Sequence, residues 1–339
     1  MPCIFDSRWD GSHGIGRFAR EIAARLEVSS YVGPGRPMSP VDPFRLSVEL
    51  RSLRGVGNWF LSPGYNGPLM SSMPYVLTLH DLNHVDRPDN SNLAKRIYYG
   101  SVLRRVSRGA RAILTVSEFS RNRIISWFGV DEQRVFNVGN GVSAAFSVRG
   151  KAYSAGMPYV LCVSNRRGHK NEAGVLAGFA GAGMPRTVKL VMTGDETPFL
   201  RAQAISLGLD DRLVFSGHVD EHALAALYRG ALCLCFPSFY EGFGLPIIEA
   251  FACGTPVLSS TVTSLPEIAG DAALLVDPHD VRAISKALAQ LHEDPGLRSV
   301  LISRGLRRSR EFSWDSVARR VREAVARVDV VPLHPLRWN

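Results

Sequence analysis

Short apolar runs alternate with helix-like stretches along most of this chain, and that alternation is the feature that most constrains its fold. Continuous apolar strands joined by helices form parallel sheets that are covered on both faces. We therefore predict an α/β protein with doubly wound parallel sheets. The apolar runs occupy 75–79, 112–116, 135–138, 159–163, 188–192, 213–215, 231–236 and 256–258. The stretches of helical pattern occupy 93–108, 118–128, 171–182, 198–207, 221–229 and 246–253.

The length of 339 residues suggests two domains. Residues 147–158 are small and polar and contain Gly and Pro, so they are predicted to be the linker between the two domains. Residues 31–43 hold four Pro and two Gly and are predicted to form a loop. We expect domains at 1–150 and 151–315. A C-terminal helix and tail at 316–339 follow them, and the helix itself is expected over about 314–328.

The composition narrows the class of protein. With 45% hydrophobic and 21% charged residues, the chain is not disordered. No window approaches 18 uninterrupted apolar residues, and the first residues lack a signal-peptide pattern. The five cysteines lie mainly in apolar runs without a metal-binding Cys-x-x-Cys pair, so we predict reduced core thiols and a cytoplasmic location.

The charge is unevenly distributed along the chain. The formal net charge is +9, and residues 1–150 carry 19 basic and 12 acidic side chains, a net charge of +7. A basic first half suggests an anionic partner. Nucleic acid, a membrane surface and a phosphorylated substrate all satisfy this requirement.

The most informative segment runs from Phe236 to Val257, where an apolar strand is followed by a loop with two glycines and then by a helix. In such a turn, backbone N–H groups and the helix dipole favour a phosphate. Glu241 lies in the loop and Glu249 in the helix. Carboxylates beside a phosphate site suit a ligand with hydroxyl groups, as in ribose and sugar rings. The alternative is a packing loop with two solvated glutamates.

The Glu-x7-Glu spacing of Glu241 and Glu249 resembles the signature of retaining glycosyltransferases of family GT4, which have the GT-B fold. The flanking segments resemble the same family in the same order along the chain. They are Ile113–Arg121, Asn140–Val142, Phe215–Val219, Leu224–Tyr228 and Leu265–Pro278. The similarity spans Gly14 to about Asp315.

The resemblance implies two Rossmann-like domains that face each other across a cleft. The first is the acceptor-side domain, the second binds the nucleotide sugar, and the C-terminal helix packs back toward the first. Glu249 resembles the carboxylate that binds the nucleotide ribose, and Glu241 the one near the donor sugar's hydroxyls. Further donor-binding candidates are Asn140, Gly217, Gly242, Phe243, Gly244 and Leu245.

A second cationic cluster follows the strand at 159–163. In Ser-Asn-Arg-Arg-Gly-His-Lys-Asn, Lys170 and Arg166 match the cation pair with which GT4 enzymes neutralise the donor diphosphate. Arg167 is the alternative to Arg166, and Ser164 stands where the family usually has Gly. A solvated basic turn is the non-functional interpretation. Fixed cations stabilise the charge that grows on a departing diphosphate. The resemblance implies that no metal or cofactor is needed.

Two sites in the first half complete the candidate set. His80 follows the strand at 75–79 and projects toward the crevice where α/β sheets bind ligands. The family has a histidine here close to the donor sugar, although a histidine that merely caps a strand end is common. Gly14 and Gly16, with Arg17, lie in a glycine-rich turn that enters a helix. Its order is wrong for a dinucleotide-binding Gly-x-Gly-x-x-Gly motif.

The stretch 93–108 is expected to be an amphipathic helix with a cationic face. Leu93, Ile97, Leu103 and Val106 are predicted to pack on the sheet. A basic amphipathic helix can lie on anionic lipid, and a solvated face is the equal alternative. The residues predicted to be exposed are Lys95, Arg96, Arg104, Arg105 and Arg108.

The resemblance to family GT4 implies a metal-independent retaining hexosyltransferase. The segments Gly-Ile-Gly-Arg-Phe and Thr-Leu-His-Asp-Leu resemble those of bacterial mannosyltransferases of exopolysaccharide or O-antigen assembly, which suggests GDP-mannose as donor. The expected acceptor is a glycan or a polyprenyl-diphosphate-linked glycan, with peripheral contact to the inner face of the plasma membrane. Alternatives are a UDP-sugar donor, an epimerase of GT-B fold and, more distantly, a nucleic-acid-binding protein.

Overall fold

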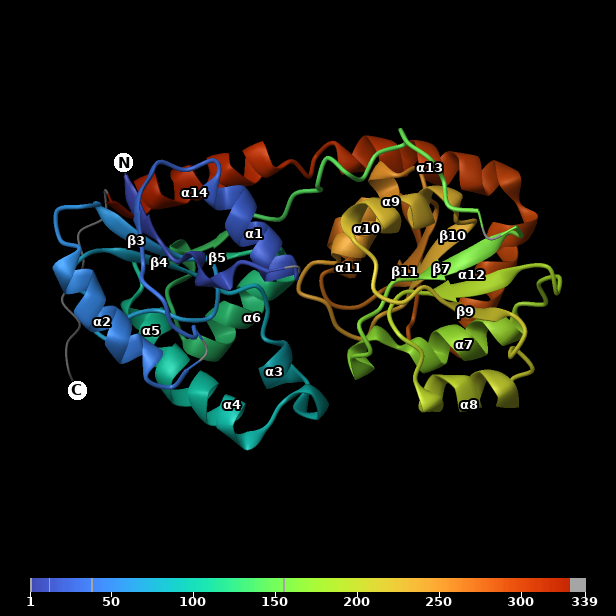
Figure 1. The fold of residues 1–339 in the computed structure, drawn as a ribbon, viewed down its shortest axis with the longest axis horizontal. Coiled ribbons are helices and arrows are strands. Elements are labelled where there is room, and N and C mark those ends of the chain that lie inside the picture. The colour runs from blue at the N-terminus through green and yellow to red at the C-terminus, as the bar shows by residue number, and fades with distance from the viewer. Residues whose placement is uncertain (1, 12, 38, 155, 330–339) are drawn as a thin grey trace. The chain divides into compact units, whose positions relative to one another are not determined.

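The computed structural model describes residues 2–329 except 12, 38 and 155. The chain forms two compact units (Figure 1). The first comprises Met1–Gly141 and Trp314–Asn339, and the second comprises Val142–Ser313. The chain therefore enters the second unit before the predicted boundary at residue 150, and returns to the first at Trp314. Of the predicted C-terminal segment, residues 330–339 lie outside the described part.

The first unit is built on a parallel sheet of six strands in the order β2-β1-β3-β4-β5-β6. The strands are β1 Cys3–Phe5, β2 Val28–Tyr31, β3 Trp59–Ser62, β4 Tyr75–Thr78, β5 Ala112–Thr115 and β6 Val135–Asn137. The α-helices are α1 Gly14–Ala23, α2 Asp42–Ser52, α3 Asn83–Asp86, α4 Leu93–Ile97, α5 Arg104–Gly109, α6 Glu118–Phe128 and α14 Trp314–Asp329. Short turns are η1 Ser7–Trp9, η2 Pro88–Asn90, η3 Tyr98–Leu103 and η4 Glu132–Arg134.

The second unit has its own parallel sheet of six strands, in the order β12-β11-β10-β7-β8-β9. Its strands are β7 Tyr159–Cys162, β8 Lys189–Met192, β9 Leu213–Phe215, β10 Cys233–Phe236, β11 Val257–Ser260 and β12 Ala273–Val276. Its helices are η5 Gly168–Lys170, α7 Glu172–Gly181, α8 Pro198–Ser206, α9 Glu221–Gly230, α10 Leu245–Ala252, α11 Leu265–Ala269, α12 Val281–Glu293 and α13 Pro295–Ser309.

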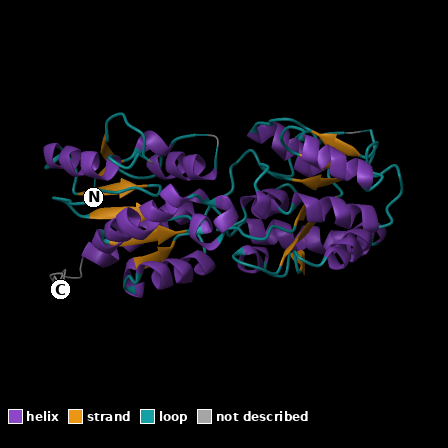
Figure 2. Ribbon diagram, turned by 90° about the horizontal axis from the view of Figure 1, so that it is seen from below, coloured by secondary structure: helices purple, strands orange, loops and turns teal. Residues whose placement is uncertain are grey.

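The predicted α/β class with parallel sheets is confirmed, since every strand pair in both sheets is parallel. Helices lie on both faces of each sheet (Figure 2). The central strands β3, β4, β5, β7, β10 and β11 are buried at every position. Burial on both faces explains why these segments read as continuous apolar runs. All five cysteines are buried and free, and burial raises the pKa of the Cys235 thiol.

Each strand order contains one point at which neighbouring strands send their connections to opposite sides. In the first sheet this point lies between β1 and β3, and in the second it lies between β7 and β10. Loops that follow the carboxyl ends of strands diverge there and leave a crevice in which α/β proteins bind ligands. A ligand-binding site is therefore expected at the loops after β1, β3, β7 and β10.

The helix over residues 93–109 differs from its prediction in one respect. Leu103 and Val106 are buried as expected, but Leu93 and Ile97 are 73% and 59% exposed. The register shifts because a π-helical turn, η3, replaces a regular α-helical turn in the middle of the helix. The buried Tyr98 and Tyr99 then take the positions that face the core.

The glycine at position 16 is required by close packing at the start of α1. A Cβ built on Gly16 would lie 2.3 Å from the Gly11 carbonyl oxygen, whereas one built on Gly100 would meet nothing within 4 Å. We expect Gly16→Ala to lower the free energy of unfolding by about 3 kcal/mol, because backbone must move. Gly100→Ala, also within a helix, should be neutral or stabilising by up to about 1 kcal/mol. Urea unfolding of both variants checks this, and equal effects would contradict it.

Candidate functional site

The turn between β7 and α7 carries Lys170 at the switch point of the second sheet. Its Nζ lies 2.8 Å from Oε1 of Glu241, and both side chains are only 12% exposed. The ammonium also lies over the ring of Phe236, 4.9 Å from the centroid. An ammonium has three N–H donors, and the Glu241 contact uses one of them. The structure thus brings together two predicted residues that are 71 positions apart.

Arg166 lies in the same turn, with a left-handed backbone (φ +62°). Its Nε donates to the carbonyl of Asp195 at 2.9 Å, its guanidinium pairs with Glu172, and it covers the ring of Phe215 at 5.3 Å. Nη2 is buried and has no hydrogen-bond partner among the described residues. Arg167, the alternative considered above, is exposed. A non-glycine residue held at positive φ is strained and is common at functional sites.

Gly217 is connected to this arginine through the loop at Gly194 and Asp195. Its φ is +66°, and its carbonyl accepts a hydrogen bond from the amide of Gly194 at 2.9 Å. Gly194 precedes Asp195, whose carbonyl is bound by Arg166. Arg166, Asp195 and Gly217 therefore lie in the loops that follow β7, β8 and β9, respectively.

The loop between β10 and α10 ends in a glycine, so no side chain caps the start of the helix. Gly244 caps α10 with φ +106° and no side-chain hydrogen bond, and Leu245 begins the helix. A Cβ at Gly244 would lie 2.7 Å from Cδ2 of Leu265, so only glycine fits without movement. In this first turn Pro246 has no N–H, and the Ile247 amide donates to the Gly244 carbonyl at 2.9 Å. Among these three residues, Leu245 therefore supplies the amide that suits an anion.

A neighbouring loop holds this segment in place, and the sequence did not reveal it. The Glu241 amide donates to Oγ1 of Thr263 at 3.2 Å. Oγ of Ser264 donates to the carbonyls of Glu241 and Phe243, at 2.9 and 3.0 Å. Thr263 has a left-handed backbone, with φ +60°. A single sequence does not predict this conformation for a threonine. These contacts fix the path of Gly242 between them.

Glu249 is buried in α10, with only 3% of its surface exposed. Oη of Tyr228 donates to its Oε2 at 2.9 Å. A buried carboxylate needs hydrogen-bond donors within the fold, because burial removes its contacts with water. Tyr228, which the sequence offered no reason to select, supplies one donor and fixes the orientation of the carboxylate.

His80 lies in the first unit, after β4, and reaches the loop after β3. Its Nε2 is 2.9 Å from the Pro63 carbonyl, which can only accept, so Nε2 carries the hydrogen and Nδ1 remains an acceptor. Burial lowers the pKa of His80 to about 4, an effect that the Pro63 contact opposes and nearby His13 reinforces. The ring is therefore neutral near pH 7 and is a weak base.

The start of α1 lies beside this histidine. His13 precedes Gly14, and its Nδ1 accepts from the Gly16 amide at 3.0 Å. Phe18, one turn further, meets the His80 ring edge-on with centroids 5.1 Å apart. The loops after β1 and β3 thus converge with His80 at the first sheet's switch point.

Asn140 is only 6% exposed, near the end of the first unit's initial segment. Its Oδ1 is buried and has no hydrogen-bond partner within the described part of the chain. A Cβ at the following Gly141 would lie 2.6 Å from the ring of Trp314, and that tryptophan packs against Phe18 with centroids 6.1 Å apart. The packing of Gly141, Trp314 and Phe18 therefore connects the segment of Asn140 to His80.

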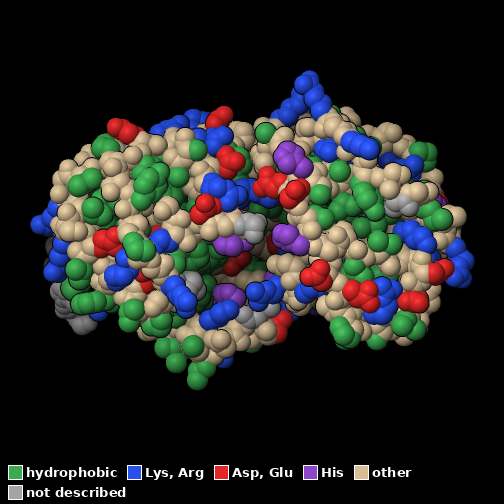
Figure 3. All heavy atoms as spheres, viewed as in Figure 1, with side chains coloured by type: hydrophobic (Ala, Val, Ile, Leu, Met, Phe, Trp, Pro, Cys, Tyr) green, Lys and Arg blue, Asp and Glu red, His purple; other side chains and the backbone are tan. Residues whose placement is uncertain are grey.

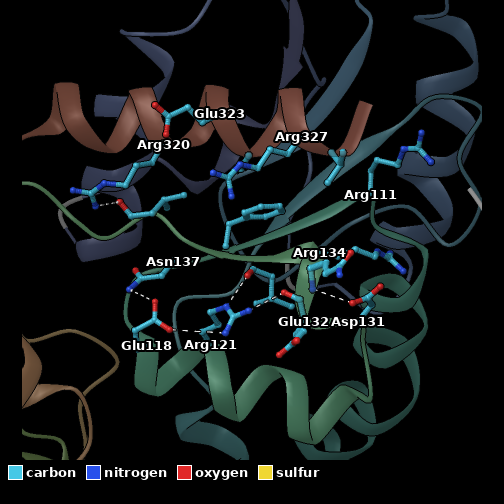
Figure 4. A pocket seen from close by; sticks show the side chains of 16 residues that line it. Arg111, Glu118, Arg121, Asp131, Glu132, Arg134, Asn137, Arg320, Glu323 and Arg327 are labelled. Carbon is cyan, nitrogen blue, oxygen red and sulfur yellow. Dashed lines mark hydrogen bonds and ion pairs between the residues drawn. The ribbon is translucent and has the colours of Figure 1, made fainter. Parts of the chain in front are cut away.

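A separate cavity of about 690 Å³ lies between α6, β6 and α14 (Figure 4). None of the predicted site residues lines it. Arg121 Nε donates to the Val135 carbonyl at 2.9 Å, and Arg320 donates to the Val138 carbonyl at 2.7 Å. Val135 belongs to the edge strand β6 and Val138 directly follows it, so these guanidinium groups bind backbone carbonyls at an edge of the sheet that would otherwise be open to pairing. Five arginines and four acidic residues line the cavity, so it has no dominant charge.

Among the residues described, no helix is both long and apolar enough to cross a membrane. No group of three His, Cys, Asp or Glu side chains arranged to hold a metal occurs in that part of the chain either.

Comparison with known proteins gives the site a context. Residues 32–146 match the family model described as Glycosyltransferase Family 4, and residues 149–308 match that described as Glycosyl transferases group 1. The chain is 33% identical over 258 residues to O-antigen chain mannosyltransferase B of Escherichia coli, covering 71% of this chain and 67% of that protein.

Two further proteins are similar to this chain, one over a small part of its own length and one over almost all of it. Serotype-specific mannosyltransferase WbdA of Escherichia coli is 29% identical over 251 residues, 69% of this chain. The match spans only 31% of that longer protein. The solved structure of sucrose-phosphate synthase from Thermosynechococcus elongatus superposes with a TM-score of 0.75 at 19% identity, covering 97% of this chain and 98% of that one.

The depressed pKa of His80 predicts a pH-dependent stability. Between about pH 6.5 and 4 the unfolded chain binds a proton that the folded chain does not, so stability falls as the pH drops through that window. The full loss is on the order of 3 kcal/mol. His80→Gln, which keeps an N–H donor for Pro63, should remove this part of the pH dependence in urea unfolding. The exposed His222, changed to Gln, is the matched control, and an unchanged slope in His80→Gln would refute the assignment.

Proposed function

The chain belongs to glycosyltransferase family 4, and from that premise we propose that it transfers mannose from GDP-mannose to a glycan acceptor with retention of configuration. It is a glycosyltransferase of GT-B fold, as predicted from its sequence. The mannosyl specificity is supported by the name of the Escherichia coli relative. We propose a lipid-linked or polysaccharide acceptor of O-antigen type, and the name of the same relative supports it.

The proposed donor site lies at the switch point of the second sheet. The single observation that supports it is the Lys170–Glu241 ion pair, which joins a cation to a carboxylate four residues before the start of α10. Lys170 and Arg166 would bind the diphosphate, Glu249 the ribose hydroxyls and Glu241 the sugar hydroxyls. Backbone from Gly242 to Leu245 would follow the sugar and diphosphate.

The proposed reaction needs no base from the protein. The bond between the anomeric carbon and the phosphate oxygen breaks, and a bond to the acceptor hydroxyl oxygen forms on the same face. The acceptor proton passes to the departing phosphate, and Lys170 and Arg166 stabilise its charge. His80 has too low a pKa to serve as a strong base. We assign its Nδ1 the acceptance of a hydrogen bond from a donor-sugar hydroxyl.

Metal independence is part of this proposal. Two side-chain cations and the N-terminus of α10 supply, at one edge of the sheet, the positive charge that a divalent metal otherwise supplies at a diphosphate. Addition of a chelator should therefore leave the initial rate of transfer unchanged.

Two substitutions test the site. Lys170→Ala should reduce transfer by about 10²–10³-fold, because a fixed cation at the leaving group is lost. Glu249→Gln keeps the side-chain volume and should weaken donor binding, measured by calorimetry with GDP. The matched controls are Lys286→Ala and Glu293→Ala, both exposed in the second unit. Near-normal turnover and normal binding in the site variants would contradict the proposal.

The donor itself is tested by a screen. We expect slow hydrolysis of GDP-mannose to release GDP faster than UDP-glucose, UDP-N-acetylglucosamine or UDP-galactose releases UDP. Preference for a UDP-sugar would replace the donor while preserving the site, since the diphosphate contacts are common to both. Failure to turn over any nucleotide sugar, with or without acceptor glycans, would contradict the function.

A further inference from the structure

The cavity of about 690 Å³ between α6, β6 and α14 has its charges at two depths. All four acidic residues that line it are exposed, and they are Glu118, Asp131, Glu132 and Glu323. Four of its five arginines are half-buried, and they are Arg111, Arg121, Arg134 and Arg320. The lining is nearly neutral in sum, but its positive charge lies inside and its negative charge lies at the rim. We call this cavity the edge-strand cavity.

Three of the inner guanidinium groups lack carboxylate partners. Within the described part of the chain, none of Arg111, Arg134 and Arg320 forms an ion pair. The Nε atoms of Arg111 and Arg134 are buried, and neither has a hydrogen-bond partner there. Burial lowers the pKa of Arg134, and burial likewise lowers the pKa of Arg320. A desolvated cation without a counter-charge destabilises the fold, and a bound anion offsets this cost.

The arginines reach the edge-strand cavity from opposite walls (Figure 4). Arg320 and Arg327 extend from α14, whereas Arg111 and Arg134 directly precede strands β5 and β6. Apolar side chains complete the walls, and they are Val135, Phe136, Val138, Ala324 and Val328. A ligand that contacts both sets of arginines therefore joins α14 to the edge of the first sheet.

The separation of charges by depth favours a small anion over an extended one. On the face drawn in Figure 3, basic and acidic side chains are interspersed over the first unit. In the edge-strand cavity, by contrast, the carboxylates at the rim repel a nucleic-acid backbone or an anionic bilayer, which are too large to enter. A small anion passes the rim and meets the arginines. The cavity volume of about 690 Å³ is typical of a small-molecule site.

We propose that the edge-strand cavity binds a phosphorylated small molecule with at least two negative charges. Arginine presents paired N–H groups that match phosphate oxygens, and Arg111 and Arg134 each have an unpartnered Nε–H. More than one uncompensated arginine requires more than one negative charge. The apolar walls suit the organic part of such a ligand. Neither Lys170 nor Glu241 lines the cavity, so this site is independent of the proposed donor site.

The test is calorimetric titration of the full chain with inorganic pyrophosphate, and with acetate as the singly charged comparison. Pyrophosphate should bind about tenfold more tightly than acetate, or more. Arg111→Gln and Arg134→Gln should each weaken pyrophosphate binding about tenfold or more, because a hydrogen bond to a charged group is lost. Glu132→Gln should tighten binding about twofold, because a repulsive charge at the rim is removed. Damage to the fold does not produce tighter binding.

Amide hydrogen exchange locates the bound pyrophosphate. Helix α14 and residues 131–138 should exchange more slowly in its presence, because the anion joins them. Lys170→Ala alters the proposed donor site in the second unit and should retain this protection. The matched control is Arg123→Gln, which removes an arginine of α6 outside the cavity and should bind within about twofold of wild type.

Thermal melts of every variant verify the fold. Arg134 also donates to the carbonyls of Arg108 and Ala110, so Arg111→Gln, which breaks no such bond among the described residues, decides the test if Arg134→Gln is unstable. Absence of pyrophosphate binding overturns the proposal, and so does binding that Arg111→Gln leaves unchanged. Protection of α14 that is lost in Lys170→Ala also overturns it. Turnover of GDP-mannose is measured separately, so failure here is distinguishable from failure of the proposed function.

Discussion

Asn171 joins the three loops on which the candidate donor site depends. Its buried Nδ2 donates to the carbonyls of Pro237 and Pro278, at 3.0 and 2.8 Å. Its Oδ1 accepts from the Gly174 amide and caps α7, and its backbone is left-handed, with φ +55°. One amide thus ties the loop after β7 to those after β10 and β12. Without these bonds, the loop that carries Lys170 would lose its connection to the loops after β10 and β12.

The parallel sheet of the second unit is legible in the sequence because its central strands are buried on both faces. Continuous apolar runs then mark β7, β8 and β10, and glycines mark the turns after them. Edge strands are harder to detect: β2 is Val-Ser-Ser-Tyr with alternating burial, and its sequence lacks a continuous apolar run. The helix at 93–109 was misread at Leu93 and Ile97 because α-helical periodicity does not anticipate a π-helical turn.

In the candidate site, too, the sequence predicts residues that belong to local motifs and misses residues that act through tertiary contacts. Glu241, Glu249 and Lys170 could be selected from motifs that lie within single loops or helices. Their supports could not, because Tyr228 and Thr263 each act on residues about twenty positions away, across strands whose order the sequence does not display. His80 was selected from its place at a strand end, whereas its neutral state depends on burial beside Phe18 and Pro63.

The basic excess of the first unit serves several structural purposes. Arg8 binds the buried carboxylates of Asp6 and Asp42, and its fork of N–H donors suits this double contact better than a lysine would. Arg121 and Arg320 cap the edge strand β6. Such uses are consistent with a chain in which arginine far outnumbers lysine. Only the arginines outside these contacts remain for an external anionic partner.

The return of the chain to the first unit has a consequence for biosynthesis. The core of that unit includes Trp314, Val317, Val321 and Val325 of α14, which the ribosome makes only after the whole second unit. Chains generally fold from the N-terminus as they emerge. In this chain, the apolar surface of the first unit that α14 covers stays exposed while the contiguous second unit is made and folds. The first domain to be synthesised is therefore the last to be completed, and a nascent chain halted before residue 314 carries an unfinished core.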